Sequence, residues 1–579
     1  MRLRNSRANN GYVGGAKYPL RYTDGYGVLT PNKCHVLETE IQDWNRPSDW
    51  IPIPEGSYPD GRFMGLVSIF QGASGNTGAT ADSNFVALRC VGTGNYIVDW
   101  GFTTAANPNG VTTSHTSNTT AFRQYNWADI PASSLTADGF KQVLVQAYPV
   151  TGTTFTQVNL NLTYSSGGVS IPFTRTTQWI DIAIHGISLT SFIFGGQSFT
   201  GNNATRHYAV KRVSIVGPTR ISGALGMFSP CMGLERVAGT DWCGPLFTDG
   251  RQVFMGAINI RSFPLWKAQN MTNMTGFAAD AKGMVKFPAI HTSKVTLFSQ
   301  LFQESVGVVD APMPSVAPGG VVHILPMLNT ALVTAWDSSF VRQRCIRELP
   351  PWSFASATNL ASMFSSCGAL EGIRYINAPN CTNASNLFNS CFRLSRIDGL
   401  TFAATVNCQN LFASCVSLRV APRIQTPTGG ITLSGTDFSG MYSNCRDLVD
   451  VPAYSFSAAG AIYNTMFSGC NALTHLPEGF KFPDNMTGLT QASSGPLHNT
   501  FSGLTELRRA TLVNPRRSFS YSLSTSTFNT LSATELNRIF TNLGGVTSVG
   551  TCTINITNNW GAAFCDRTIA TAKGWTVTG

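Results

Sequence analysis

Charged residues are scarce in this chain: Asp, Glu, Lys and Arg make up 12% of its 579 residues, whereas 43% are hydrophobic. Intrinsic disorder requires the opposite balance, so the composition excludes a disordered chain. The formal net charge of +10 is small for this length and does not by itself indicate nucleic-acid binding. We therefore expect a folded protein with several domains and no nucleic-acid partner.

Long apolar runs are also missing. The sequence contains no stretch of about 18 apolar residues, so we expect no membrane insertion. The start, Met1-Arg-Leu-Arg-Asn-Ser-Arg7, leads into Ala-Asn-Asn-Gly and not into an apolar segment, so we expect no secretory signal peptide. A protein made and kept in a cytoplasm would hold its 14 Cys mostly reduced.

Sequence motifs of catalysis are lacking as well. We find no nucleotide-binding glycine motif, no nucleophile elbow and no His-Glu-x-x-His, and the eight His are scattered. We therefore predict no enzyme, no cofactor and no metal site. Folding can bring distant carboxylates together, so a glycan-cleaving carboxylate pair stays open as an alternative.

A repeat organises the second half of the chain. Each copy has an aromatic residue, five free positions, a large apolar residue, two free positions, a second apolar residue and often Pro. In one copy the aromatic residue is Phe364, the large apolar residue is Leu370 and the second apolar residue is Ile373. Consecutive copies are mostly 23 to 26 residues apart, the period of a solenoid whose coils each hold one short strand. We expect the aromatic residues to stack in the core; they are Phe228, Phe254, Phe277, Phe302, Phe340, Phe364, Phe388, Phe412, Tyr442, Phe467 and Phe501.

Cysteine recurs at one position of the repeat, three residues after the aromatic. We interpret it as a small buried residue at a tight turn. Stacked disulfides would need converging Cβ vectors, and a metal site would need converging ligands at short spacing. Just before this position, apolar residues at i, i+3 and i+4 predict a short helix or helical turn. The cysteines of the repeat core are Cys367, Cys391, Cys415, Cys445 and Cys470.

The pattern Asn-Leu-x-x-Met-Phe-x-x-Cys-x-x-Leu-x-x-Ile, beginning at Asn359, resembles the BspA-like class of leucine-rich repeats. The resemblance covers roughly residues 215–515, although irregular insertions and copies without Cys depart from the pattern. It implies an α/β solenoid of about eleven coils. The class occurs in bacterial surface proteins and in bacteriophage tail and fibre proteins, where it implies binding and not catalysis.

Charged residues concentrate at the two free positions between the large apolar residue and the next apolar residue of each copy. We expect these side chains to face water in one column along the solenoid. Two interpretations stay open: a solvated face that keeps the sheet soluble, or a mostly basic strip for an anionic surface glycan or a partner protein. The candidate binding strip consists of Arg236, Arg261, Lys286, Arg347, Arg396, Arg419, Arg508 and Arg509.

Outside the repeat, we predict an extended arm at 1–58 and an antiparallel β-sandwich at 59–208. In the arm, Trp44 and Trp50 are candidates for docking onto another subunit or for packing on the sandwich. The motif Tyr96-Ile-Val-Asp-Trp100-Gly101 resembles an edge motif of immunoglobulin-like PKD domains. The solenoid fills 209–515, and an α/β cap fills 516–579, with a helix opened by Ser532-Ala-Thr-Glu535, a strand at 551–556, a helix at 562–572 and a last strand at 575–577.

The fold class expected is thus mixed and β-rich: a sandwich, a leucine-rich-repeat solenoid and a cap. The segment from Trp44 through Trp100, and the closing Ala-Lys-Gly-Trp575-Thr-Val, resemble parts of phage virion and tail proteins. The resemblance implies a bacteriophage virion protein, a tail-fibre or baseplate component that binds other virion proteins and a host surface glycan or protein. A capsid decoration or head-fibre protein and a bacterial cell-surface adhesin are the alternatives. We expect a homo-oligomer, for which a trimer would be typical of fibres, although no coiled-coil heptads enforce one.

Overall fold

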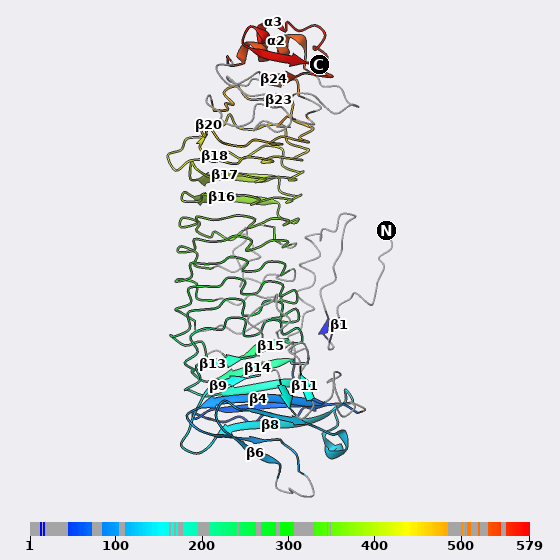
Figure 1. Ribbon diagram of the computed structural model, residues 1–579, viewed down its shortest axis with the longest axis vertical. Helices are drawn as coiled ribbons and strands as arrows, with labels where there is room; N and C mark the ends of the chain where they lie inside the picture. The colour runs from blue at the N-terminus through cyan, green and yellow to red at the C-terminus, as the bar shows by residue number, and fades with distance from the viewer. Residues whose placement is uncertain are drawn as a thin grey trace, which may run out of the picture. The chain divides into compact units, whose positions relative to one another are not determined.

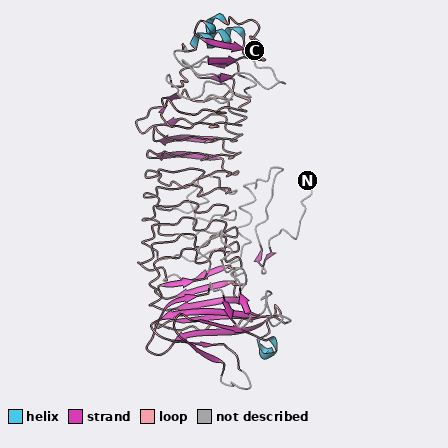
Figure 2. Cartoon of the chain, in the orientation of Figure 1, coloured by secondary structure: helices cyan, strands magenta, loops and turns pink. Residues whose placement is uncertain are grey.

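The computed structural model describes residues 12–13, 16–17, 45–71, 84–103, 110–160, 164–166, 169–171, 178–194, 209–239, 242–261, 268–284, 290–305, 328–343, 346–347, 349–483, 500–501, 504, 507–510, 519–520, 531–545 and 552–579. Its chain divides into two compact units, one of Met1–Arg21 with Asn32–Asn329 and the other of Tyr22–Pro31 with Thr330–Gly579. The protein is rich in β-structure, and the helices among these residues are short (Figure 2). None of those helices is long and apolar enough to cross a bilayer.

The first unit contains two large sheets. The seven-stranded sheet has the order β15-β14-β12-β3-β8-β5-β6, and the four-stranded sheet has the order β13-β9-β4-β7 (Figure 1). The strands of the larger sheet are β3 (Arg62–Ile69), β5 (Tyr96–Asp99), β6 (Thr112–His115), β8 (Lys141–Pro149), β12 (Trp179–His185), β14 (Arg212–Val216) and β15 (Arg236–Ala238). Those of the smaller are β4 (Phe85–Gly92), β7 (Thr120–Gln124), β9 (Phe155–Asn159) and β13 (Ser191–Ile193).

Apolar packing holds these sheets together. Every residue of β12 is buried, as expected for a strand covered on both faces. The Trp179 ring lies over Gly65 of β3, where an added Cβ would come within 2.4 Å of the ring. Between the sheets, Tyr96 of β5 meets Phe155 of β9 edge-on at 6.3 Å. Thus the expected strand-rich domain is present, with its core between and within the two sheets.

The sheets are mixed, which corrects the expectation of a purely antiparallel sandwich. Strands β3, β5, β6 and β8 pair antiparallel, but β12 pairs parallel with β14, and β14 pairs parallel with β15. In the smaller sheet, β13 and β9 are parallel. Strands β14 and β15 lie beyond residue 208, so the large sheet continues into the first repeat copies. Each of these strands is added parallel to the strand before it.

Successive repeat copies are joined by parallel pairing within each unit. In the first unit, single bridges link Gly223, Asp249, Asn273 and Leu297 in turn. In the second, bridges link Ala335, Asn359, Asn383 and Asn407, and the strands β16 (Gly372–Ala378), β17 (Arg396–Phe402) and β18 (Ile424–Gln425) form a parallel sheet (Figure 1). Shorter parallel pairs follow: β19 (Thr432–Leu433) with β20 (Ser455–Phe456), and β21 (His475–Leu476) with β22 (Arg509–Ala510).

The segment before each Cys forms two consecutive turns, not the short helix predicted from apolar spacing. Around Phe364, Met363 N donates to Leu360 O and Cys367 N donates to Phe364 O. The third residue of each turn, Ser362 (φ 57°) and Ser366 (φ 62°), is left-handed, which a helix does not allow. Backbone N–H groups that do not close these turns donate to carbonyls of the next coil, as Phe364 N does to Leu387 O at 3.0 Å.

The stacking expected of the repeat aromatics is confirmed in the second unit. Ring centroids are 5.7 Å apart for Phe340 and Phe364, 5.9 Å for Phe364 and Phe388, and 5.6 Å for Phe388 and Phe412, with interplanar angles of 11° or less. The stack continues through Tyr442 and Phe467 to Phe501. In the first unit, Phe228 stacks on Phe254, but Phe254 meets Phe277 edge-on. Phe302 is buried.

The C-terminal segment matches most of its expected elements. Helix α2 (Ala533–Asn542) begins at the predicted Ser532 cap, whose hydroxyl accepts from Glu535 N at 3.2 Å. Strands β23 (Phe519–Ser520), β24 (Cys552–Asn555) and β25 (Trp575–Thr578) form a parallel sheet. The helix predicted over 562–572 is wrong in extent, because only α3 (Thr568–Thr571) is helical; Gly561 and the following residues form turns.

Candidate functional site

The candidate binding strip follows neighbouring strand positions in each unit. In the second unit, Glu371 N donates to Arg347 O, Arg396 N to Glu371 O, and Asp450 N to Arg419 O. Farther along, Arg508 N donates to Thr474 O, and Arg509 pairs with His475. Arg347 is half-buried, whereas Arg396, Arg419, Arg508 and Arg509 are exposed. These strip positions therefore lie in one column of adjacent backbone.

In the first unit the strip is interrupted. Arg236 is exposed, but Arg261 is buried with 7% of its surface accessible, so the expectation that it faces water is wrong. The acidic neighbour Glu235 is also buried, and Lys211 reaches it at 2.8 Å. The repeat frame fixes where the backbone lies, but residues outside the frame decide what covers a side chain. Lys286 lies outside the described residues.

Ion pairs neutralise part of the column. Arg396 Nε lies 3.3 Å from an Asp398 carboxylate oxygen, and Arg509 lies 3.0 Å from Glu478. Arg393, on the turn before β17, lies 3.7 Å from Glu371. All these side chains are at least a third exposed, so each pair contributes at most about 1 kcal/mol to stability. Arg396 and Arg509 are thus already matched with acidic neighbours.

Three exposed arginines on neighbouring coils are not matched in this way. Arg374 of β16, Arg419, and Arg423 just before β18 are exposed, and they form no ion pair within the described part of the chain. The first and third lie outside the strip because the repeat frame ends before their positions. We call Arg374, Tyr375, Arg419 and Arg423 the arginine–tyrosine patch.

Tyr375 is held against the sheet at its ring edge and its hydroxyl. In the parallel register it is opposite Gly399 of β17, and its hydroxyl hydrogen-bonds the Thr401 hydroxyl. A Cβ at position 399 would come within 2.9 Å of two Tyr375 ring carbons, so glycine leaves the space that the ring occupies. The side chain remains 53% exposed. The structure therefore presents a fixed aromatic surface beside cationic side chains.

The described part of the N-terminal arm, which begins at residue 45, packs on the sheets of the first unit. Asp181 of β12 is fully buried and accepts from Arg46 Nε at 2.7 Å and from Arg212 Nε at 2.8 Å. Trp50 is 6% exposed and packs with Leu66, Phe140 and Ile180. Of the two alternatives for Trp50, docking onto another subunit or packing on the sandwich, the structure shows the second; Trp44 lies outside the described residues.

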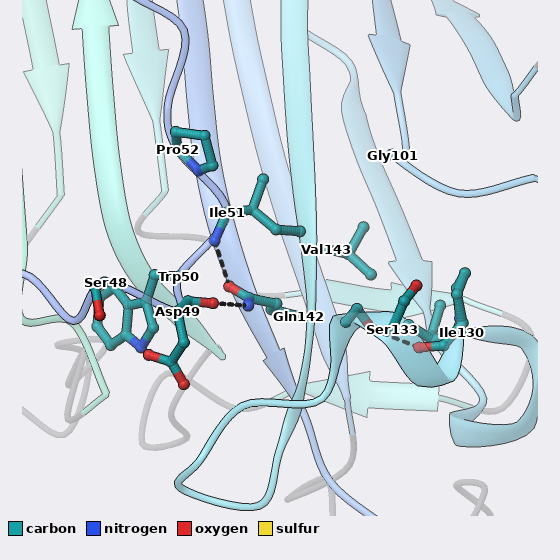
Figure 3. Close-up of a pocket in the computed structure, with 12 residues that line it drawn as sticks. Ser48, Asp49, Trp50, Ile51, Pro52, Gly101, Ile130, Ser133, Gln142 and Val143 are labelled. Atoms are coloured by element: carbon teal, nitrogen blue, oxygen red, sulfur yellow. Dashed lines mark hydrogen bonds between the residues drawn. The ribbon is translucent and has the colours of Figure 1, made fainter.

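A shallow pocket of about 490 Å³ lies beside this docked arm (Figure 3). Gln142 of β8 holds the arm by accepting from Ile51 N at 2.8 Å and donating to Asp49 O at 2.6 Å. Ser133, Ser134 and Ile130 border the opposite side of the pocket. Because Asp49 also accepts from Ala137 N, the polar groups of the arm are used to fix it in place.

The repeat cysteines are unreactive in this fold. Each thiol donates to the carbonyl of the aromatic in the preceding coil, as Cys391 Sγ does to Phe364 O at 3.1 Å. Burial raises the pKa of the Cys391 and Cys445 thiols to about 12. No group of three potential metal ligands occurs among the residues that the structure describes, and the cysteines there are free thiols. The repeat cysteines therefore serve the packing of the core.

Comparison with known proteins adds little to these observations. No protein-family model and no curated protein matches the chain. Two solved structures show a faint likeness: a plant peptide hormone receptor, RGFR1 in complex with RGF2, at 10% identity and a TM-score of 0.19, and the Drosophila Toll–Spatzle complex at 12% identity and 0.14. The matches cover 64% and 66% of this chain and 67% and 64% of those chains.

Proposed function

We propose that the stacked coils form a leucine-rich-repeat solenoid of the BspA-like class, and that the chain is a bacteriophage virion protein. Its role would be that of a tail-fibre or baseplate component that attaches the particle to its host. The repeat resemblance supports the class, and the parallel register of β16, β17 and β18 supports the stacking of coils. The sheets of the first unit would anchor the protein to other virion proteins.

The observation that carries the binding role is the exposed arginine–tyrosine patch. A face that served only solubility would gain nothing from a tyrosine pinned over a glycine, because any polar side chain satisfies that need. Here Tyr375 is exposed by 53% and is held by Thr401, so little side-chain entropy would be lost when a partner covers it. Aromatic and arginine side chains are also the residues that most often dominate binding energy.

Immunogold electron microscopy tests the location. Antibody raised against residues 215–515 is applied to purified particles from the source culture. Gold at the tail tip or fibres is the expected result. Gold around the head would make the protein a decoration or head-fibre protein, and labelled bacterial envelopes beside bare virions would end the phage proposal.

Adsorption to host cells tests the binding role. The full chain is labelled and titrated onto cells, and then compared with variants in which Arg396, Arg419 or Arg508 is changed to Gln. We expect the Arg419→Gln variant to lose more affinity than Arg396→Gln, because Arg396 is already paired with Asp398. Equal adsorption by all variants and the parent would contradict binding through this face.

A further inference from the structure

We infer that the arginine–tyrosine patch is a binding site for an acidic polysaccharide, with sugar carboxylates on the arginines and a sugar ring on Tyr375. This inference rests on the proposed attachment function and names the chemistry of its ligand. The patch extends over three successive coils of the second unit, carried by β16, β17 and the approach to β18 (Figure 1). It therefore has an extended form that suits a linear chain.

The register places Tyr375 and Arg423 in one row, and Arg374 precedes Tyr375 on β16. Tyr375 pairs with Gly399, and Leu400 N donates to Arg423 O at 3.3 Å, so position 423 lies beside position 399 in the next coil. Neighbouring strands are about 4.8 Å apart, which puts the backbones at Tyr375 and Arg423 about 10 Å apart, on either side of the glycine. The Tyr375 ring lies against the glycine between them.

The charges favour an anionic ligand. Two acidic side chains beside the patch, Glu371 and Asp398, are paired with Arg393 and Arg396. The three arginines of the patch are left to supply positive charge, and arginine binds carboxylates through two parallel hydrogen bonds. Asp450 pairs with Val420 in the next coil and limits the patch on that side.

The tyrosine favours a sugar over a protein surface as the occupant. A protein partner usually buries an aromatic anchor in a pocket, whereas the Tyr375 hydroxyl is already bonded to Thr401 and the edge of its ring lies against Gly399. A ring that is fixed at its edge and 53% exposed offers a face for stacking against the apolar face of a sugar ring. Only the ring face and the arginines then remain for the ligand.

The experiment measures binding of the full chain to polygalacturonate, with uncharged dextran as the neutral probe and dextran sulfate as the sulfated one. The key variant is Arg374→Gln with Arg423→Gln. Its matched control is Arg220→Gln with Lys294→Gln, which removes the same charge from exposed positions of the first unit that lie outside the candidate binding strip. Thermal unfolding verifies that each variant is folded. Tyr375→Leu is compared with Tyr375→Phe, which keeps the ring.

We expect polygalacturonate to bind and dextran not to bind. The patch double variant should lose at least tenfold in affinity while the control loses less than threefold, and Tyr375→Leu should weaken binding more than Tyr375→Phe. Equal loss in patch and control variants would show only nonspecific attraction and would overturn the inference. Tighter binding of dextran sulfate would reject carboxylate recognition, as would no binding to polygalacturonate.

Adsorption to host cells separates this inference from the attachment function. Cells are treated with periodate, which destroys sugars, or with protease before the labelled chain is added. Loss of adsorption after periodate supports the glycan. Loss only after protease would identify a protein partner and overturn the glycan inference while leaving attachment intact. Absence of adsorption to untreated cells would count against both.

Discussion

At the residue scale, the repeat cysteine is best understood as a small hydrogen-bond donor. Cys367, Cys391 and Cys415 each donate to an aromatic carbonyl one coil earlier, at 3.0 to 3.1 Å. In the coil of Phe302 the same position is Ser305, whose hydroxyl donates to Ala278 O. The same carbonyl also accepts from a backbone N–H of its own turn, as Phe364 O does from Cys367 N, so the thiol adds a second buried hydrogen bond and the position favours a donor of minimal size.

Substitution at Cys391 tests this explanation. Cys391→Ser keeps a donor and should change stability little, whereas Cys391→Ala removes the donor and should cost about 1–2 kcal/mol. Urea unfolding followed by near-ultraviolet circular dichroism gives the difference. If Cys391→Ser lowered the free energy of unfolding more than Cys391→Ala, the position would require apolar volume and not a hydrogen-bond donor.

The buried thiols also predict loss of stability in alkali. An unfolded thiol titrates near pH 8.5, whereas burial raises the pKa of Cys381, Cys391 and Cys445 to about 12. Below about pH 8.5 the thiols are protonated in both states and their contribution is complete. Above that pH the unfolded chain loses protons first, so the free energy of unfolding should fall continuously toward pH 12.

Unfolding free energies measured between pH 7 and pH 11 check this slope, with Cys391→Ser as the control that removes one titrating group. The variant should show a shallower fall than the parent. A parent curve that is flat over this range would mean that the thiols reach water in the folded state. Thiol alkylation of the folded protein should likewise be slow at pH 8.

At the element scale, paired left-handed residues shape each coil. They lie two residues before and two after the stacked aromatic, as Asn386 and Ser390 do around Phe388, with φ of 56° and 62°. Gly440 and Gly469 fill equivalent positions in later coils. A left-handed backbone conformation at a residue with a Cβ costs about 1–2 kcal/mol of stability. The turns of the coils therefore require many strained positions.

Glycine substitution at Ser366 should therefore stabilise the fold. Ser366→Gly relieves the strain of φ 62° and should raise the free energy of unfolding by up to about 1 kcal/mol. The control is Ser365→Gly at the neighbouring, equally half-buried position, which is not left-handed and should lose about 0.5–1 kcal/mol. Thermal unfolding of the two variants should thus shift in opposite directions, and a shift in the same direction would contradict the turn assignment.

At the scale of the whole molecule, the described coils of the second unit pair and stack with the coils before and after them. Gly372 pairs with Arg396, so residues 372–395 make one coil, and Phe388 lies between Phe364 and Phe412 in the stack. In such a quasi-one-dimensional array, stability is roughly a sum over coils and their interfaces. Removing a whole coil brings equivalent residues together, whereas removing half a coil does not.

Deletion of residues 372–395 should therefore leave a folded protein with a slightly lower melting temperature. Deletion of 372–383, half a coil, places the next aromatic on the wrong side and should abolish cooperative unfolding of the second unit. Near-ultraviolet circular dichroism during a thermal scan distinguishes the outcomes. A folded half-coil variant would show that the aromatic stack does not set the register.

Much of the architecture follows from spacing alone. The interval between Phe364, Phe388 and Phe412 predicts their stacking, because equal spacing in a parallel array brings equal positions together. The Ser532 cap likewise predicts where α2 begins. The helix expected before Cys367 fails for a local reason: apolar spacing of three and four is shared by paired turns, and Ser362 and Ser366 give little sign of their left-handed geometry.

The sequence by itself determined the period of the chain, its stacked aromatics, its buried thiols and its column of charged strand positions. Only the tertiary structure decided that Arg261 is buried, that Trp50 packs on its own sheets, and that Tyr375 lies over Gly399 beside unpaired arginines. The reason is physical: a repeat fixes which backbone positions are neighbours. The exposure and pairing of a side chain depend on groups far away in the sequence that the fold brings beside it.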